Sequence, residues 1–268
     1  MDPSLCLRSE LLSSAGFGHA FFTREGGASS GPFASLNLSL GVGDRAEDVA
    51  ENRFRVARVL GVDAERLYVP RQVHERGVLV VDGREAEAEV AATDADAIVS
   101  DGPGFACAVR TADCVPLLMA DRETRRVAAI HAGWRGVVKG VATETLGIFR
   151  ARGSRPEHLL VAIGPHISLA AFEVGQDVAL QLSAASLASQ VVTSLSAPKA
   201  HVALARILVA QLTEQGMSLA NIDVLEGCTF SEPARFFSYR RDGKRSGRQL
   251  SAIVSEPIVS STTATRTR

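Results

Sequence analysis

Five short apolar segments follow one another closely in the middle of the chain, near residues 77–81, 96–100, 105–110, 115–120 and 126–131. Short apolar runs that are bounded by polar and glycine-containing turns are typical of β-strands. Parallel neighbours need a crossover of about a dozen residues or more, and most gaps between these segments are shorter than that. The spacing therefore predicts a mostly antiparallel or mixed sheet.

Further segments predict that helices accompany these strands. We expect additional strands near 17–22, 159–163, 222–227 and 249–254, and helices over about 44–60, 134–150, 176–190 and 200–215. Asp44 and Glu47 have the spacing of a capping box, and Gly61 is placed to end the first helix. The pattern is that of an α/β (α+β) protein.

No internal repeat and no linker divides the chain, which has 268 residues. We expect one layered α/β domain with a mixed sheet over residues 1–255. The segment 256–268 is small, polar and unpatterned, so we expect it to be disordered.

Bulk composition excludes several classes of partner. A hydrophobic fraction of 46% supports a large core, and a formal net charge of −1 gives no field that attracts nucleic acid or an anionic membrane. No apolar stretch approaches the roughly 20 residues of a transmembrane helix, and the first residues do not resemble a signal peptide. We therefore expect a cytoplasmic protein whose four cysteines are reduced thiols rather than disulfides.

Cysteine and histidine occupy the ends of the apolar segments. Cys114 closes a polar turn, His131 ends the segment that follows, and His74 lies before the segment at 77–81. Three such ligands leave one position of a tetrahedral zinc ion open, as in a catalytic site. Their separations match no short metal-binding motif, and a buried Cys or a structural His is an equally good interpretation. Asp113 is suited either to orienting an imidazole or to forming the turn.

Arginines and aromatic residues supply candidate substrate contacts. Trp134 could stack on a flat ring, and Arg135 could hold an anion at the start of a helix. Arg240 and Arg241 follow three aromatic residues, a combination that suits phosphate or a planar base. His166 follows a Gly-Pro pair at a strand end and is a further possible contact. The alternatives are that Trp134 fills the core and that the arginines are solvated.

Several ordered motifs resemble one known family. They are Thr23–Gly27, Ser35–Leu38, Val42–Asp44, Asn52–Arg53, Gln72–His74, Asp94–Asp96, Thr111–Pro116, His131–Gly136, Gly164–Pro165 and Phe236–Asp242. Together they resemble the YfiH-like laccase-domain family, whose members are described as multifunctional purine nucleoside phosphorylases or as polyphenol oxidases. The resemblance spans residues 17 to 254.

The resemblance implies a fold related to the bacterial toxin-deamidase type of cysteine hydrolase. It also implies metal-dependent phosphorolysis of adenosine, inosine, guanosine and methylthioadenosine, with purine nucleosides and phosphate as partners, and deamination of adenosine. His74, Cys114 and His131 stand at the positions of the zinc ligands. His166 and Ser231 depart from the family, since many members have Cys there, so a role for those extra thiols does not carry over.

Three other functions compete with the phosphorylase. A copper-dependent polyphenol oxidase needs many histidines, usually in His-x-His pairs, whereas this chain has six histidines and no such pair. Cu²⁺ could nevertheless replace Zn²⁺ by affinity. A metal-free cysteine hydrolase or amidase, acting for example on a cell-wall precursor, would use Cys114 as nucleophile and His131 as base. A purine-binding module without activity is the third. The sequence does not determine the oligomeric state.

Overall fold

A computed structural model describes residues 5–186, 192–193 and 199–256, and its strands form three sheets. In spatial order, the five-stranded sheet contains β1 (Cys6–Leu7), β2 (Gly18–Phe22), β14 (Gln249–Val254), β6 (Ala106–Thr111) and β3 (Leu67–Tyr68). The six-stranded sheet contains β13 (Ile222–Val224), β9 (Leu159–Ile163), β7 (Val115–Asp121), β8 (Val127–Ala132), β5 (Ala97–Ser100) and β4 (Val78–Val81). A small sheet contains β10 (Glu173–Gly175), β12 (Lys199–Val202) and β11 (Val192–Thr193).

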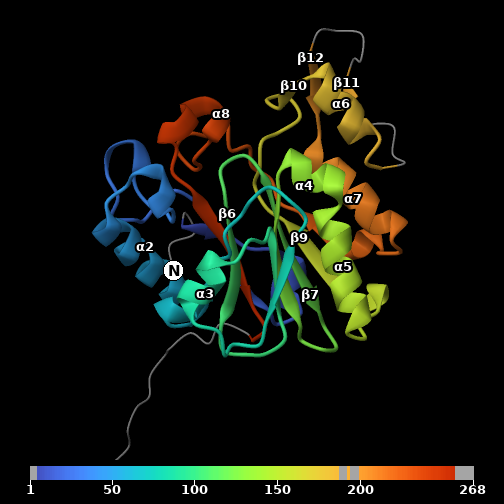
Figure 1. Ribbon diagram of the computed structural model, residues 1–268, viewed down its shortest axis with the longest axis horizontal. Helices are drawn as coiled ribbons and strands as arrows, with labels where there is room; N and C mark the ends of the chain where they lie inside the picture. Colours follow the sequence, from blue (N-terminus) through green and yellow to red (C-terminus); the bar gives the residue numbers. More distant parts are fainter. Residues whose placement is uncertain (1–4, 187–191, 194–198, 257–268) are drawn as a thin grey trace, which may run out of the picture.

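The two large sheets pack face to face, and helices cover their outer faces (Figure 1). On the five-stranded sheet lies α2 (Ala46–Leu60), and on the six-stranded sheet lie α4 (Trp134–Lys139), α5 (Val141–Ala151) and α7 (Leu204–Glu214). The other helices are α1 (Glu10–Ser14), α3 (Glu87–Ala92), α6 (Gln176–Ser183) and α8 (Tyr239–Asp242). The order of layers is helix, sheet, sheet, helix.

Apolar residues on both faces of the six-stranded sheet hold these layers together. In β7, Leu117 and Met119 pack toward the helices, whereas Leu118 and Ala120 pack toward the five-stranded sheet. A strand that is buried on both faces has a continuous apolar sequence instead of an alternating one. This burial explains why the central segments were recognisable as strands.

The mixed α/β architecture predicted from the sequence is confirmed. In the six-stranded sheet, β4–β5 and β9–β13 are parallel pairs, whereas β5–β8, β7–β8 and β7–β9 are antiparallel. The segment predicted at 105–110 does not join this sheet. It forms β6, which pairs with β14 and β3 in the five-stranded sheet, so the run of strands is divided between two layers.

The predicted start of the first long helix is wrong, although its end is confirmed. The helix begins at Ala46 without a side-chain cap. The carboxylate of Asp44 instead accepts hydrogen bonds from the hydroxyl of Ser29 at 2.7 Å and from the amide of Asn37 at 2.8 Å. Gly61 ends the helix with a φ of 74°. Tertiary contacts have therefore replaced the local cap.

Two predicted helices differ in the structure. The one over 134–150 is interrupted at Gly140, whose φ of 76° divides it into α4 and α5. The one over 200–215 begins only at Leu204, because Lys199–Val202 forms β12 between β10 and β11. Burial alternates along β12, as expected for a strand and not for a helix.

Some predictions fall partly outside the described residues. The helix predicted over 176–190 ends at Ser183, and residues 187–190 lie outside the described part. The predicted tail also lies outside it, apart from residue 256. No helix among the described residues is long and apolar enough to cross a membrane.

His19 is a buried histidine in β2. Its Nε2 atom accepts a hydrogen bond from the backbone N–H of Ser9 at 2.8 Å, and its Nδ1 atom lies 3.0 Å from the carbonyl oxygen of Phe17. These partners require a neutral ring with the proton on Nδ1. Burial lowers the pKa of His19 to about 4, despite the hydrogen bond to Phe17. The residue has a structural role.

Candidate active site

Cys114 and His131 meet at one end of two neighbouring antiparallel strands. Cys114 directly precedes β7, and Pro116 lies opposite His131 in the β7–β8 pair. His74 comes from the loop before β4 and has a left-handed backbone, with a φ of 61°. The possible ligand atoms of all three residues lie within 4.8 Å of one another. The structure therefore brings together the three residues predicted as metal ligands.

Asp96 holds the loop that carries His74. This carboxylate is fully buried and accepts hydrogen bonds from the backbone N–H groups of Val73, His74 and Glu75 at 3.3, 3.0 and 2.6 Å. Three consecutive N–H groups directed at one carboxylate fix the backbone around His74. The left-handed conformation of His74 is thus maintained by contacts outside its own loop.

The same carboxylate orients His131. The Nδ1 atom of His131 lies 2.8 Å from Oδ1 of Asp96, and the backbone N–H of His131 donates to the carbonyl of Asp96 at 2.7 Å. Burial alone would raise the pKa of Asp96, but the hydrogen bonds from His131, Glu75 and His74 outweigh it and lower the pKa. An ionised carboxylate only accepts, so Nδ1 of His131 carries a proton and Nε2 faces Cys114.

The thiol of Cys114 is strongly acidic in this environment. Burial would raise its pKa, but the charges and hydrogen bonds of His131 and His74 outweigh that effect and lower the pKa to about 6. The pKa of His131 rises to about 9: burial opposes this, and the Cys114 and Asp96 charges overcome it. At neutral pH the thiol is therefore a thiolate, the form that binds metals and acts as a nucleophile.

Asp113, considered from the sequence as the residue that orients an imidazole, has other partners. Its Oδ1 atom accepts a hydrogen bond from the hydroxyl of Thr229 at 2.7 Å, and its Oδ2 atom accepts from the backbone N–H of Arg240 at 2.6 Å. Asp113 thus connects the β6–β7 turn to the segment that begins α8. Asp96, and not Asp113, contacts an imidazole.

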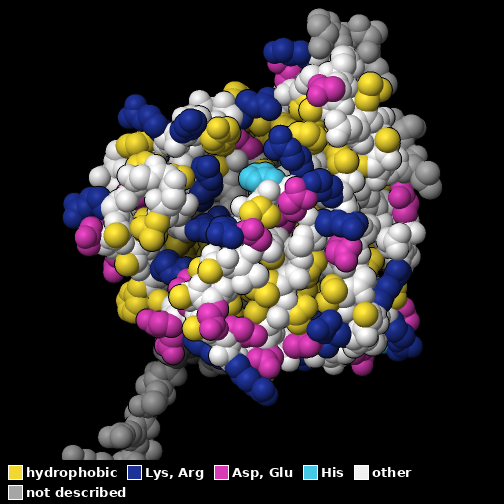
Figure 2. Space-filling view, in the orientation of Figure 1, with side chains coloured by type: hydrophobic (Ala, Val, Ile, Leu, Met, Phe, Trp, Pro, Cys, Tyr) yellow, Lys and Arg dark blue, Asp and Glu magenta, His cyan; other side chains and the backbone are white. Residues whose placement is uncertain are grey.

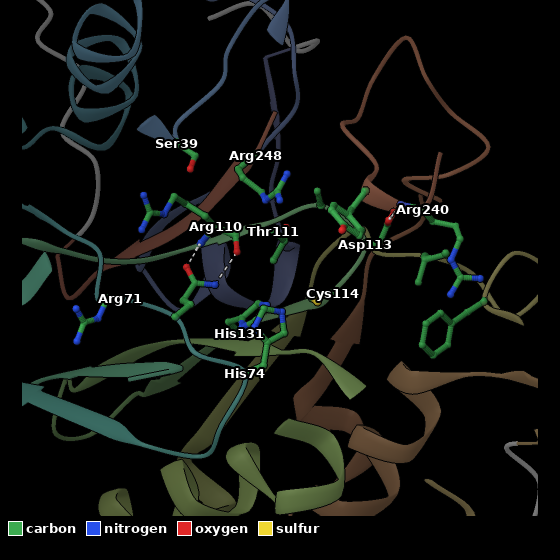
Figure 3. Close-up of a pocket in the computed structure, with 15 residues that line it drawn as sticks. Ser39, Arg71, His74, Arg110, Thr111, Asp113, Cys114, His131, Arg240 and Arg248 are labelled. Carbon is green, nitrogen blue, oxygen red and sulfur yellow. Dashed lines mark hydrogen bonds between the residues drawn. The ribbon is translucent and has the colours of Figure 1, made fainter. Parts of the chain in front are cut away.

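These residues open into a pocket of about 580 Å³. Figure 2 shows a histidine side chain at the bottom of a hollow that is surrounded by Lys and Arg side chains. Four arginines line the pocket, namely Arg71, Arg110, Arg240 and Arg248 (Figure 3). Ile167, Phe172 and Tyr239 supply apolar surface. A volume of this size is typical of a small-molecule site.

Only part of the predicted substrate-binding set lines this pocket. Arg240 does; its guanidinium lies 5.3 Å from the ring centre of Phe172 and donates to the carbonyl of Glu173 at 2.9 Å. Trp134 does not line the pocket and packs against the core between the six-stranded sheet and its helices. The guanidinium of Arg135 lies over the Trp134 ring, 4.7 Å from its centre.

Arg241 and His166 also lie outside the pocket lining. The guanidinium of Arg241 donates to the carbonyls of Thr229, Phe230 and Phe236 at 2.8, 3.0 and 3.0 Å. It therefore holds together the loop before α8. The Nδ1 atom of His166 lies 2.9 Å from the carbonyl oxygen of Gly164, and burial lowers the pKa of this histidine.

The sequence predicted no role in the site for four of its polar residues, namely Ser39, Asp96, Arg110 and Arg248. Asp96 belongs to the motif Asp94–Asp96, which carries the family resemblance. An aspartate at the start of a fully apolar strand was a usable signal for Asp96, since an isolated buried carboxylate requires partners. No local pattern marks the two arginines, because they meet only through the pairing of β6 with β14.

A family model described as "Multi-copper polyphenol oxidoreductase laccase" matches residues 18–256. The chain belongs to this laccase family. The resemblance stated from the sequence motifs is thereby confirmed, and the match covers the pocket and all the strands and helices described above except β1 and α1.

Relatives of this laccase-family chain carry other names. A protein of Deinococcus radiodurans named purine nucleoside phosphorylase is 41% identical over 238 residues, which cover 88% of each chain. A protein of an unknown prokaryote named adenosine deaminase RL5 is 36% identical over 228 residues, covering 82% of this chain and 87% of that protein. The crystal structure of YfiH from Bacillus licheniformis has a TM-score of 0.87 at 30% identity, covering 94% of this chain and 97% of YfiH.

Proposed function

We propose that this protein is a zinc-dependent purine nucleoside phosphorylase that acts on adenosine, inosine, guanosine and methylthioadenosine and also deaminates adenosine. The observation that carries the proposal is the convergence of His74, Cys114 and His131 at the floor of a pocket lined by arginines. The names of the Deinococcus and RL5 relatives support both activities.

The donor set fits zinc. Two imidazoles and a thiolate are typical zinc ligands, and bond lengths of about 2.0 Å to nitrogen and 2.3 Å to sulfur place ligand atoms roughly 3.5 Å apart. The ligand atoms here lie within 4.8 Å, so small side-chain shifts suffice. Asp96 fixes the ring of His131 with Nε2 toward the centre, as carboxylates do for many zinc-bound histidines. Three protein ligands leave a fourth position for water or substrate.

Each activity needs a different nucleophile at the same site. In phosphorolysis, a phosphate oxygen forms a bond to C1′ of the ribose while the bond from C1′ to N9 breaks. The purine takes the electron pair and a proton, and ribose 1-phosphate is the other product. In deamination, the oxygen of a water forms a bond to C6 of adenosine and the bond from C6 to the amino nitrogen breaks, so that ammonia leaves and inosine is the other product. A bound zinc ion would supply Lewis acidity and lower the pKa of a water to about 7.

The chain's own residues provide positioning and charge. The arginines of the pocket wall favour an anionic co-substrate, and the apolar surface at Ile167 and Phe172 suits a planar base. Asp96 keeps the imidazole of His131 in one orientation throughout. Holding two reactants together in this way accelerates a reaction between them.

One observation favours a second candidate, a metal-free cysteine hydrolase. Cys114, His131 and Asp96 form a hydrogen-bonded chain of thiolate, imidazole and carboxylate. That arrangement is suited to nucleophilic attack on an amide. The two functions differ in their need for metal, since chelation abolishes the first and leaves the second.

Chromatography of adenosine incubated with the zinc-loaded protein tests the proposal. We expect adenine and ribose 1-phosphate only when phosphate is present, inosine with or without phosphate, and neither product with Cys114→Ala. Cys6→Ala removes a thiol outside the pocket and is the matched control. Activity that survives chelation would contradict the proposal and favour the hydrolase.

A further inference from the structure

Two arginines, Arg110 and Arg248, lie on the same face of the five-stranded sheet as the core residues under α2, at the edge next to the pocket. Ala106 and Ala108 of β6 face the core under α2, and Arg110 continues the same row. Leu250 of β14 lies opposite Arg110, and Arg248 precedes Leu250 by two residues. Because side chains two residues apart in an extended segment share a face, the two guanidinium groups emerge together at the edge of this core. Both line the pocket.

The guanidinium of Arg110 has no anionic partner among the described residues. In the part of the chain that the structure describes, its guanidinium makes no hydrogen bond and no ion pair; its backbone alone is bonded, to the side chain of Gln72. Burial, followed by the charges of Arg53 and Arg248, lowers the pKa of Arg110. Glu87, whose charge opposes this shift, is paired with Arg53: its Oε1 atom lies 3.2 Å from the guanidinium of Arg53. The side chain of Arg110 is half-buried, and a half-buried charge without a partner favours the binding of an anion.

Arg248 is held in place but is not neutralised. Its guanidinium donates to the carbonyls of Ser246 and Gly247 at 2.7 and 2.8 Å, and no ion pair of Arg248 occurs among the described residues. Burial lowers its pKa, and the charges of Cys114 and Asp113 oppose that effect. Arg248 and the candidate metal ligand Cys114 line the same pocket.

Ser39 adds a neutral hydrogen-bonding group. The residue is 8% exposed and lines the pocket. Its backbone is fixed by Asn37, which accepts from the N–H of Ser39 at 3.1 Å and donates to its carbonyl at 2.9 Å. The hydroxyl has no hydrogen-bond partner within the described residues. In Figure 3 it points toward the space beside Arg110 and Arg248.

From these contacts, we propose that Arg110, Arg248 and Ser39 form the subsite that binds inorganic phosphate as co-substrate; the inference rests on the phosphorylase function proposed above. Two guanidinium groups and a hydroxyl provide convergent donors for the oxygens of a dianion. Of the other two arginines of the pocket, Arg71 is paired with Asp94, and Arg240 lies against the ring of Phe172, apart from Ser39, Arg110 and Arg248 in Figure 3.

The subsite also orients the nucleoside. In Figure 3, Ser39, Arg110 and Arg248 lie on one side of the His74–Cys114–His131 group, and Arg240 lies on the other. Phosphate held on the first side approaches C1′ of a ribose placed at the centre. The purine then leaves toward the side of Arg240, which lies against the apolar ring of Phe172. Phosphate and purine would then occupy different parts of the pocket around C1′.

The test compares Arg110→Gln, Arg110→Lys and Ser39→Ala with the wild-type protein. Arg84→Gln is the control, because Arg84 is highly exposed and lies outside the pocket. Binding of inorganic phosphate to the zinc-loaded protein is measured by calorimetry. The KM values for phosphate and for inosine are measured separately in phosphorolysis, and the rate of adenosine deamination is measured without phosphate.

We expect Arg110→Gln to raise the KM for phosphate by about ten-fold or more, as the loss of a hydrogen bond to a charged group predicts. The KM for inosine and the deamination rate should change much less. Arg110→Lys should recover part of the phosphate affinity, Ser39→Ala should raise the KM for phosphate by less, and Arg84→Gln should not raise it. Without phosphate, Arg110→Gln should raise the melting temperature, because an unpaired and half-buried charge is removed.

An unchanged KM for phosphate in Arg110→Gln would overturn the subsite. A second result would also overturn it, namely that AMP is deaminated faster than adenosine and that this preference is lost in Arg110→Gln. The arginines would then bind the 5′-phosphate of a nucleotide and not inorganic phosphate. If the wild-type protein neither phosphorolyses nor deaminates nucleosides, the proposed function fails. In that case, calorimetry with phosphate still tests the subsite. Loss of phosphate binding in Arg110→Gln would support the subsite, and unchanged phosphate binding would refute it.

Discussion

Asp96 offers the sharpest test of how the site is built, through the substitution Asp96→Asn. The carboxylate has two oxygens, and each accepts two hydrogen bonds. Oδ1 accepts from the backbone of His74 and from the ring of His131, and Oδ2 accepts from the backbones of Val73 and Glu75. An amide keeps one oxygen and turns an NH₂ group toward the other pair of donors. Two N–H groups therefore lose their acceptor in a buried place.

The magnitude follows from this count. A buried donor left without an acceptor costs about 1–3 kcal/mol, so two cost about 2–6 kcal/mol of the free energy of unfolding. The ring of His131 also loses its charged partner, and changes of this kind typically reduce metal affinity about 10- to 100-fold. Urea denaturation measures the first effect at pH 7. Titration of zinc against a chromophoric chelator measures the second.

Asp94→Asn is the matched control for this substitution. Asp94 is half exposed and pairs with Arg71 at the surface, where an ion pair contributes about 0–1 kcal/mol. We expect this variant to resemble the wild-type protein in stability and in zinc affinity. If Asp96→Asn were also within about 1 kcal/mol of the wild type and bound zinc equally tightly, Asp96 would not be the residue that positions the ligands.

Three further predictions follow from single residues. The free energy of unfolding should fall by up to about 3 kcal/mol between pH 6.5 and pH 4. In this range His19 binds a proton in the unfolded chain but not in the folded one, where its pKa is about 4. Urea denaturation at several pH values should show a smaller fall in His19→Asn. In Gly133→Ala the new Cβ would lie 3.0 Å from the ring of His74 and 3.1 Å from the sulfur of Cys114, so chelator competition should show weaker zinc binding. Gly147→Ala places its Cβ in open space within α5, and urea denaturation should show a gain of about 1 kcal/mol with zinc affinity unchanged.

Much of the sheet structure was predictable, because burial on both faces gives strands an unbroken apolar sequence. β7, β8 and β9 were each found within one or two residues of their bounds. The division into two sheets was not predictable, since β6 has the same apolar character as its neighbours. The strand at Lys199–Val202 was missed because it depends on pairing with β10 and β11. The break at Gly140 was missed although it is local, since glycine commonly ends a helix in a left-handed conformation.

Within the site, the residues whose side-chain type alone indicates metal binding were predictable. His74, Cys114 and His131 were identified by type and by motif, and the structure places them together. Asp96 acts through four hydrogen bonds that only the folded chain defines. The position of Arg110 beside Arg248 was not predictable, since it follows from the pairing of β6 with β14.

The position of β14 has a consequence for how the protein is made. This strand is the last described one, yet it lies in the interior of the five-stranded sheet, between β2 near the start of the chain and β6. Pairing across such sequence distances slows folding, since a long loop must close before the contacts form. During synthesis, β14 must therefore emerge from the ribosome before the five-stranded sheet can form. Until then β2 and β6 have unpaired edges that invite aggregation, and chaperone dependence during synthesis is the expected result.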